Sequence, residues 1–276
     1  MKTVRLPDGT NVPALGQGTW MMAEDPQRRA DEIAALRAGI DLGMTLIDTA
    51  EMYADGESER LVGEAVAGRR DDVFLVGKAY PQNASSSGLP DACEASLGRL
   101  GTDRLDLYLL HWRGRVPLGE TVEAMERLVD AGKILRWGVS NLDTDDMEEL
   151  VAAGGKACAT DQILYNLTRR GPEHDLLPWL AARRMPVMAY SPVEQGRLVA
   201  DEGLRALAGE FGVTPAQVAL AWLLARDDVI AIPKAGTVEH VRENRAAADL
   251  VLSSEAIVQL NAMFPPPSDP VPLAML

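Results

Sequence analysis

Short, continuous apolar runs alternate with amphipathic segments along the whole chain. The runs lack the polar–apolar alternation of a sheet with one wet face, so they predict parallel strands in a sheet covered by helices. Between the runs, apolar residues recur at helical spacing, as at Ile33, Leu36 and Ile40. Glu57 or Ser58 is expected to cap the second helix. The predicted strands are residues 15–20, 44–47, 73–78, 105–110, 134–139, 159–164, 187–190 and 229–232, and the predicted helices are residues 26–43, 61–66, 91–100, 121–131, 144–152, 176–183, 204–225, 238–248 and 254–264.

Eight strand–helix units predict an α/β fold of the (β/α)8 TIM-barrel type. The chain of 276 residues suits one such barrel, which needs roughly 250 residues. Residues 3–13 alternate around Asp8-Gly9, a strong hairpin signal, and predict an N-terminal β-hairpin that covers one end of the barrel. An extra C-terminal helix and an irregular tail, residues 265–276, follow the last unit. Because no linker or low-complexity stretch interrupts the pattern, residues 1–276 are expected to form a single domain.

A doubly wound parallel sheet is the competing architecture. It would favour a glycine fingerprint at the first turn, but Gly16-Gln17-Gly18 lacks the third glycine and does not open a helix. These glycines instead predict a close backbone approach at the end of the first strand.

The net charge and the apolar content limit the classes of partner that we expect for this protein. The net charge is −14, from 27 basic and 41 acidic residues, which argues against nucleic acid or an anionic membrane as a partner. No apolar signal core is present, and the longest fully apolar run, residues 218–225, is too short to span a bilayer. A cytoplasmic protein is expected.

The cysteines and histidines offer little for metal or disulfide chemistry. Cys93 and Cys158 fall inside predicted elements and are expected to be small apolar fillers. Three histidines without a CxxC or HxxxH pattern make a metal site improbable.

Polar residues end nearly every predicted strand, and in a parallel barrel these ends meet at one mouth. Each residue alone has an ordinary explanation: Asp48 as a turn cap, Lys78 as a surface charge, His111 as a core histidine and Tyr53 as a loop aromatic. Their joint placement favours an active site. The residues that follow or end the strands are Asp48, Lys78, His111, Ser140, Asn141, Gln162, Tyr190, Ser191 and Lys234.

The chemistry that this set suits is the reduction of a carbonyl group. A neighbouring ammonium, from Lys78, is expected to lower the pKa of the Tyr53 hydroxyl so that it serves as a general acid. Asp48 would hold Lys78, and His111 would donate a hydrogen bond to the substrate oxygen. No side chain supplies a hydride, so a nicotinamide cofactor is implied.

These motifs resemble the signatures of the aldo-keto reductases, and the likeness covers essentially the whole chain. The matching stretches are Leu46-Ile47-Asp48-Thr49-Ala50-Glu51-Met52-Tyr53, Gly77-Lys78, Leu109-Leu110-His111-Trp112, Gly138-Val139-Ser140-Asn141 and Ile232-Pro233-Lys234. The tail Phe264-Pro265-Pro266-Pro267 and the short loops are similar to the bacterial branch, which includes methylglyoxal and 2,5-diketo-gluconate reductases.

The resemblance implies a role for each matching position. Asp48, Tyr53, Lys78 and His111 match the catalytic tetrad, with Tyr53 as the general acid. The implied cofactor contacts are Ser140, Asn141 and Gln162 to the nicotinamide carboxamide, Tyr190 stacked on the nicotinamide ring, Ser191 to the pyrophosphate, Lys234 to the adenosine 2′-phosphate, and Glu243 and Asn244 to the adenine. Trp20 and Trp112 match aromatic walls of the substrate pocket, although Trp20 could equally be a packing residue.

One departure from the family pattern affects the cofactor. NADPH-preferring members usually have a serine or threonine after the lysine and an arginine six residues beyond it, where this chain has Ala235 and His240. Arginine clamps a phosphate at any pH, whereas histidine is mostly neutral near pH 7. Lys234, Arg242 and the backbone N–H groups at the start of the helix at residue 238 remain for the anion. His240 is counted among the cofactor residues, with an exposed helix residue without a role as its alternative. NADPH is therefore expected to be preferred, with NADH possible.

The leading interpretation is an NADPH-dependent reductase of small aldehydes, ketones or dicarbonyls that acts as a monomer. A catalytically idle relative that serves as a cofactor-binding regulatory or structural subunit is the main alternative. A barrel aldolase or isomerase that uses Lys78 as a Schiff base is a third.

Overall fold

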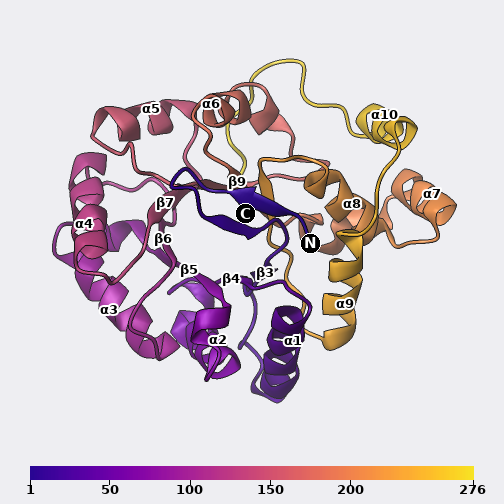
Figure 1. Ribbon diagram of the computed structural model, residues 1–276. Coiled ribbons are helices and arrows are strands. Elements are labelled where there is room, and N and C mark those ends of the chain that lie inside the picture. Colours follow the sequence, from indigo (N-terminus) through magenta and orange to yellow (C-terminus); the bar gives the residue numbers. More distant parts are fainter.

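The predicted strands form one parallel sheet that curls into a barrel (Figure 1). In the computed structural model, which describes residues 1–276, strands β3 (Gln17–Gly18) to β10 (Val229–Ala231) follow each other around the sheet in chain order. Parallel bridges from Leu15 to Ala231 and from Gly18 to Lys234 join the last strand to the first. The (β/α)8 prediction is confirmed.

Helices surround the sheet as an outer ring (Figure 1). The remaining barrel strands are β4 (Leu46–Asp48), β5 (Phe74–Ala79), β6 (Leu107–Leu110), β7 (Trp137–Ser140), β8 (Asp161–Leu164) and β9 (Val187–Tyr190). The helices are α1 (Arg29–Asp41), α2 (Glu57–Val66), α3 (Gly88–Leu100), α4 (Leu118–Asp130), α5 (Thr144–Ala152), α6 (Leu176–Ala182), α7 (Glu202–Phe211), α8 (Pro215–Leu224), α9 (Val238–Ala247) and α10 (Ser254–Met263), and a 3-10 turn, η1 (Pro26–Arg28), precedes α1.

Gly18 allows the barrel to close. A Cβ atom at this position would lie 2.7 Å from the carbonyl oxygen of Ile232, closer than real Cβ contacts come. The backbone N–H of Gly18 donates instead to the carbonyl of Pro233 at 3.0 Å. The predicted close approach at the Gly16-Gln17-Gly18 stretch is therefore confirmed.

The N-terminal hairpin covers one end of the barrel (Figure 1). Its strands, β1 (Thr3–Arg5) and β2 (Asn11–Pro13), pair antiparallel as predicted. Arg136, which immediately precedes β7, donates to Asp8 at 2.9 Å and to Thr10 at 3.0 Å. The hairpin therefore lies over the N-terminal ends of the strands, and the C-terminal ends face the opposite mouth.

The single helix predicted over residues 204–225 is wrong, because the chain forms two helices that meet at an 82° bend. Gly212 ends α7 in a left-handed conformation with φ 65°. Thr214 then caps α8, in a capping box with Gln217, and Pro215 fills the first helical position. These are strong stop and start signals, and they outweigh the continuous apolar pattern.

The predicted cap of α2 is also wrong. Gly56, with φ 86°, occupies the cap position, and no side chain caps the helix. Glu57 begins the helix. Ser58 is fully buried within its first turn, and its hydroxyl donates to the side-chain oxygen of Thr19 at 2.9 Å.

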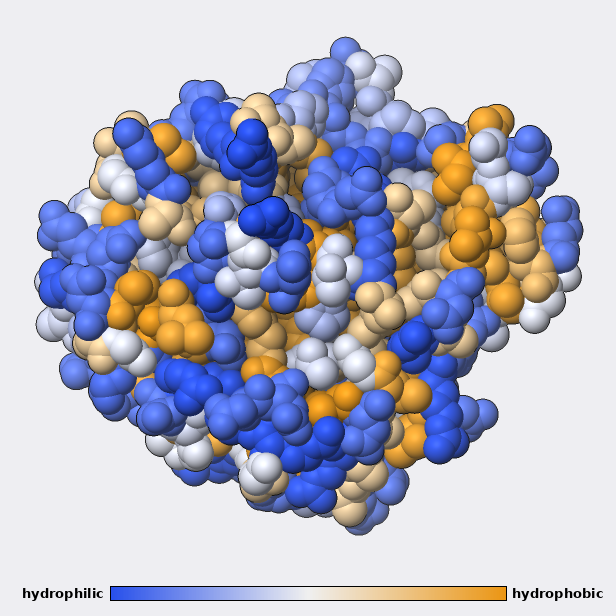
Figure 2. All heavy atoms as spheres, viewed as in Figure 1, coloured by the Kyte–Doolittle hydropathy of each residue, from blue (hydrophilic) through white to orange (hydrophobic).

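Hydrophobic side chains from the strands and the inner helix faces pack into one core, which includes the buried, unpaired Cys93 and Cys158. The hairpin side of the surface is mostly hydrophilic, with hydrophobic residues gathered over α7 and α10 at the right of the view (Figure 2). No single helix is long and apolar enough to cross a membrane. Helices α7 and α8 have the required length and apolarity only when they are counted as one segment across their bend.

Candidate active site

A cavity of about 820 Å³ opens at the C-terminal ends of the strands. Its size is within the range typical of small-molecule sites. Of the predicted site residues, all but Lys78 line it: Trp20, Asp48, Tyr53, His111, Trp112, Ser140, Asn141, Gln162, Tyr190, Ser191, Lys234, His240, Glu243 and Asn244. In the structure, as inferred from the sequence, the strand ends converge on one site.

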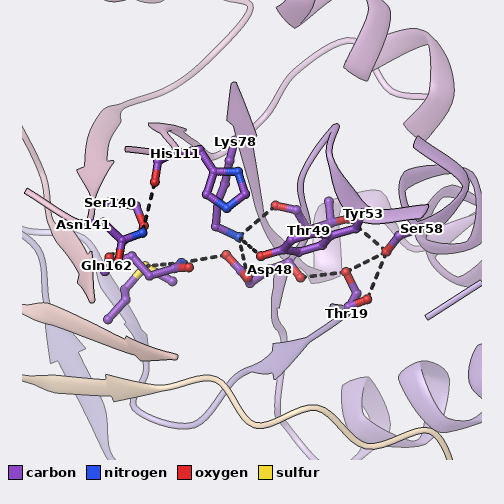
Figure 3. Close-up of polar contacts among 11 residues, drawn as sticks. Thr19, Asp48, Thr49, Tyr53, Ser58, Lys78, His111, Ser140, Asn141 and Gln162 are labelled. Atoms are coloured by element: carbon purple, nitrogen blue, oxygen red, sulfur yellow. Dashed lines mark hydrogen bonds and ion pairs between the residues drawn. The ribbon is translucent and has the colours of Figure 1, made fainter. Parts of the chain in front are cut away.

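Lys78 is fully buried, and its side chain points toward Asp48 and Tyr53, which line the cavity (Figure 3). Its ammonium nitrogen donates to Asp48 Oδ2 at 2.7 Å, to the Thr49 carbonyl at 3.2 Å and to the Tyr53 hydroxyl at 2.9 Å. An ammonium has three N–H donors, so all three are used. Because Tyr53 accepts from Lys78, its own O–H proton is free to point elsewhere.

The surroundings of Lys78 and Tyr53 determine whether each side chain is protonated. Burial alone would lower the pKa of Lys78, but Asp48 and Tyr53 together outweigh burial and raise it, so the side chain stays an ammonium. The expectation that Lys78 lowers the pKa of Tyr53 is wrong as a net effect. Burial raises the pKa of Tyr53 by more than Lys78 lowers it, and Asp48 adds to the rise. Tyr53 therefore keeps its proton at neutral pH.

Three hydroxyl groups brace the segment that carries Asp48 and Tyr53 (Figure 3). Thr19 Oγ1 donates to the Asp48 carbonyl at 2.9 Å, and Ser58 Oγ lies 2.9 Å from Thr19 Oγ1 and 3.3 Å from Thr49 Oγ1. The sequence analysis missed this cluster. Thr49 stands in a matched motif, but no local pattern relates Ser58 on α2 to Thr19.

His111 follows β6 and faces the cavity as a neutral ring. Burial, reinforced by the positive charge of Lys78, lowers the pKa of His111 to about 2. Its Nδ1 atom is buried without a hydrogen-bond partner. The ring lies 5.8 Å from that of Tyr53 and 4.9 Å from that of Trp112, measured between centroids. A neutral imidazole still carries one N–H donor for a ligand oxygen.

Gln162 reaches across the barrel to the charged cluster. Its amide nitrogen donates to Asp48 Oδ1 at 2.8 Å, so both carboxylate oxygens of Asp48 are used. The side-chain carbonyl oxygen of Gln162, Oε1, makes no hydrogen bond within the protein and remains available to an amide ligand. Sequence spacing predicted that Gln162 faces the mouth but not that it contacts Asp48.

Ser140, Asn141 and Tyr190 form a second hydrogen-bonded group. Asn141 adopts a left-handed conformation with φ 59°, and its amide donates to the His111 carbonyl at 3.1 Å and to Ser140 Oγ at 3.0 Å. The Tyr190 hydroxyl donates to Asn141 Oδ1 at 2.9 Å. Ser140 Oγ also donates to the backbone carbonyl oxygen of Gln162 at 2.7 Å. Asn141 thus fixes both the Tyr190 ring and the backbone at His111.

The other half of the cavity is built by the loop after β9 and by the start of α9. Ser191, with φ 46°, opens that loop, and its carbonyl accepts from Asn166 at 2.9 Å. Lys234 follows β10, while His240, Glu243 and Asn244 line the cavity from α9. Arg242, on the same helix, does not line it.

Two tryptophans form part of the wall. Trp20 is 37% exposed and borders the cavity, which contradicts a purely packing role. Trp112 is held edge-on against Tyr80, with ring centroids 5.9 Å apart.

Further lining residues escaped the sequence analysis. Met275 and Leu276, at the end of the tail, reach back and line the cavity. Thr214, Pro215 and Ala216 border it at the break between α7 and α8. The Thr-Pro pair was a visible helix-start signal that could have revealed this break.

The cavity fits a dinucleotide better than a metal. It runs from the Tyr53–His111 end, with free amide and imidazole groups, to a basic end at Lys234 and the start of α9. No group of three or more His, Cys, Asp or Glu side chains is arranged to hold a metal ion.

Comparison with known proteins gives a consistent result. The pattern of the aldo/keto reductase family matches residues 14–264. The methylglyoxal reductase YeaE of Escherichia coli (strain K12) is 52% identical over 281 residues, which cover 100% of this chain and 99% of that protein. A crystal structure of an aldo/keto reductase from Klebsiella pneumoniae with NADP and acetate has a TM-score of 0.97 at 54% identity, covering 100% and 99% of the two chains. The crystal structure of a protein assigned as 2,5-diketo-D-gluconic acid reductase B has a TM-score of 0.87 at 32% identity, covering 100% of this chain and 97% of that one.

Proposed function

The chain belongs to the aldo/keto reductase family, and from that premise we propose that it reduces small aldehydes, ketones or dicarbonyls to alcohols with NADPH as its preferred cofactor. Methylglyoxal is the first substrate to test, because the E. coli relative that is 52% identical along the whole chain is a methylglyoxal reductase. The NADP-bound Klebsiella structure supports the choice of cofactor.

One observation carries the proposal: the Lys78 ammonium donates to the Tyr53 hydroxyl oxygen at 2.9 Å, and its other two donors are used by Asp48 and Thr49. In this arrangement Tyr53 is the proton donor to the substrate oxygen. Burial keeps its hydroxyl protonated until a stronger base, the developing alkoxide, comes within reach. Lys78 then stabilises the tyrosinate that remains.

Asp48 has a positioning role. It holds Lys78 through Oδ2 and is itself held by Gln162 through Oδ1. Its negative charge balances the buried ammonium, which would otherwise be costly to bury.

His111 orients the substrate. Because its pKa is lowered to about 2, it donates a hydrogen bond as a neutral ring and does not compete with Tyr53 as an acid. Trp20 and Trp112 would form the walls around a small carbonyl compound.

The cofactor supplies the hydride, which no side chain can provide. The residues that would hold it are Ser140, Asn141 and Gln162 at the carboxamide, Tyr190 against the ring, Ser191 at the pyrophosphate, Lys234 and His240 at the 2′-phosphate, and Glu243 and Asn244 at the adenine. The free side-chain oxygen of Gln162 and the place of Tyr190 in the cavity lining support these assignments.

The alternatives have less support. A Schiff-base role for Lys78 requires a free neutral amine, whereas this amine is buried, hydrogen-bonded three times and charged. No feature of the site favours an idle subunit, since Lys78 contacts both Asp48 and Tyr53. The Tyr53 ring in turn lies edge-on to that of His111.

We propose further that residues 1–276 act as one domain and as a monomer in a bacterial cytoplasm. The single closed sheet and common core support one domain. Light scattering coupled to size-exclusion chromatography would test the monomer, and a mass near 29.8 kDa is expected.

The decisive experiment follows the loss of the reduced-nicotinamide absorbance with methylglyoxal and with a simple aromatic aldehyde, using NADPH and NADH in parallel. Consumption of NADPH with either substrate is expected. Cofactor binding without any turnover, across a panel of small carbonyl compounds, would favour the idle-subunit alternative instead.

A further inference from the structure

Two basic side chains from distant parts of the sequence meet at Gly236. A Cβ atom at Gly236 would lie 2.7 Å from Nη2 of Arg28 and 3.4 Å from Nζ of Lys234. Arg28 ends the 3-10 turn η1, before α1, whereas Lys234 follows β10. The packing of α1 against α9 brings the two side chains together.

Neither cation has a protein partner that neutralises it. Arg28 and Lys234 make no ion pair, whereas the neighbouring Arg29 pairs with Glu64 at 2.6 Å. The nearest carboxylate is that of the buried Glu32, whose Oε1 lies 3.7 Å from the Gly236 Cβ position and whose Oε2 accepts from the Ala23 N–H at 2.9 Å. No carboxylate therefore forms an ion pair with either cation, although Glu32 and Glu24 lie near enough to act on the charge of Lys234.

The two cations also oppose each other. Burial lowers the pKa of Lys234, and the charge of Arg28 lowers it further, with Glu32 and Glu24 acting in the opposite direction. Lys234 lines the ligand cavity and Arg28 lies behind it, next to Gly236. Two such cations kept together are a poor arrangement unless an anion lies near both.

The backbone adds donors at the same place. Thr237 caps α9, a helix of ten residues, and only the N–H of His240 is used by the Thr237 side chain. The N–H groups of Val238 and Glu239 have no acceptor in the helix, because no carbonyl precedes them at the required distance. The positive end of the helix therefore faces the same region as Arg28 and Lys234.

We propose that Arg28 is the second cation of the site that binds the adenosine 2′-phosphate, and that it replaces the arginine that this chain lacks at position 240. The inference rests on the proposed function, because it needs an NADPH-binding cavity. A guanidinium binds two phosphate oxygens at once, at any pH, whereas an imidazole ring has no such fork of parallel donors. Arg28 thereby preserves the discrimination between NADPH and NADH.

The test measures the dissociation constants of NADPH and NADH by tryptophan fluorescence for the wild type, Arg28→Gln and Arg29→Gln. Arg29→Gln is the matched control, since it removes one positive charge at the adjacent position, where the guanidinium faces Glu64. Arg28→Gln should weaken NADPH binding by about tenfold and NADH binding by less than about twofold, because one charge-assisted phosphate contact is lost. Arg29→Gln should change neither by more than about twofold.

Adenosine 2′,5′-bisphosphate and adenosine 5′-monophosphate, used as competitors of NADPH, isolate the phosphate. Arg28→Gln should weaken only the bisphosphate, and Arg28→Lys should recover part of the loss. An equal loss for NADPH and NADH, or no loss for either, would overturn the role of Arg28 while leaving the reductase intact. A wild type that binds neither dinucleotide would overturn the proposed function, and this inference with it.

Discussion

The Lys78 ammonium lies 2.9 Å from the Tyr53 hydroxyl oxygen, although the two residues are 25 positions apart and belong to different strand–helix units. The contact fixes the direction of proton flow in the site. Since Lys78 donates, Tyr53 can give its proton only to something in the cavity. Both groups are buried, so this arrangement persists in the absence of substrate.

Removing the tyrosine hydroxyl should separate chemistry from binding. Tyr53→Phe is expected to lower kcat by about a hundredfold to ten-thousandfold, the usual contribution of a general acid. The dissociation constant of NADPH should change by less than about twofold, because Tyr53 is not among the assigned cofactor contacts. Stopped-flow single-turnover rates and fluorescence titration measure the two quantities. Turnover at the wild-type rate would rule out Tyr53 as the acid.

The pH profile of the reduction should show no titration of His111. Because burial and Lys78 lower the pKa of His111 to about 2, that ring stays neutral from pH 5 upward and causes no change in rate near its ordinary pKa of 6.5. Burial raises the pKa of Tyr53 above its ordinary 10.0, so kcat/KM should fall only in strongly alkaline solution, as the acid loses its proton. A measurement of kcat/KM from pH 5 to pH 11 tests both statements, and a break near pH 6.5 would contradict the first.

Asp48 should matter for stability as well as for activity. Asp48→Asn removes the countercharge of a fully buried ammonium and is expected to lower the free energy of unfolding by about 3–5 kcal/mol. Urea denaturation monitored by circular dichroism measures the change. Asp41→Asn is the control, because Asp41 also forms a short ion pair, with Arg69 at 2.6 Å, but at the surface. The control should leave the unfolding curve unchanged within error, and similar losses in both variants would argue against the role of burial.

Asp161 is a carboxyl group that the proposed mechanism does not use. It is fully buried, neither oxygen has a hydrogen-bond partner, and burial raises its pKa well above the ordinary 3.8, with the nearby Leu142 amide offsetting part of the rise. The folded state therefore binds a proton that the unfolded state releases above pH 3.8, and this contribution to stability falls as the pH rises.

Asp161→Asn should consequently stabilise the protein at pH 7 by about 1 kcal/mol or more, roughly the value of one pKa unit, with a smaller gain at pH 4. Urea denaturation of wild type and variant at the two pH values measures this difference. A gain of the same size at both pH values would indicate a packing effect instead.

The sequence by itself determined the barrel and the position of most of the site. Continuous apolar strands ending on Asp48, Lys78 and His111 are local patterns, and the geometry of a parallel barrel carries such ends to one mouth. Residues 229–231 and 17–18 close the sheet as the pattern predicted. For the same reason, the predicted cofactor residues line one cavity.

Only the tertiary structure decided which of these groups touch and what their surroundings do to them. Gln162 binds Asp48, Ser58 supports Thr19 instead of capping α2, and Leu276 returns to the cavity, because each contact depends on the path of the chain between distant segments. The net direction of the Tyr53 pKa depended on how completely the hydroxyl is buried, which a neighbouring lysine in the sequence does not reveal. The approach of Arg28 to Lys234 is of the same kind, since it arises from the packing of α1 on α9 and has no local signal. Local patterns fix where polar groups leave the strands, whereas burial and long-range packing fix their partners and their charge.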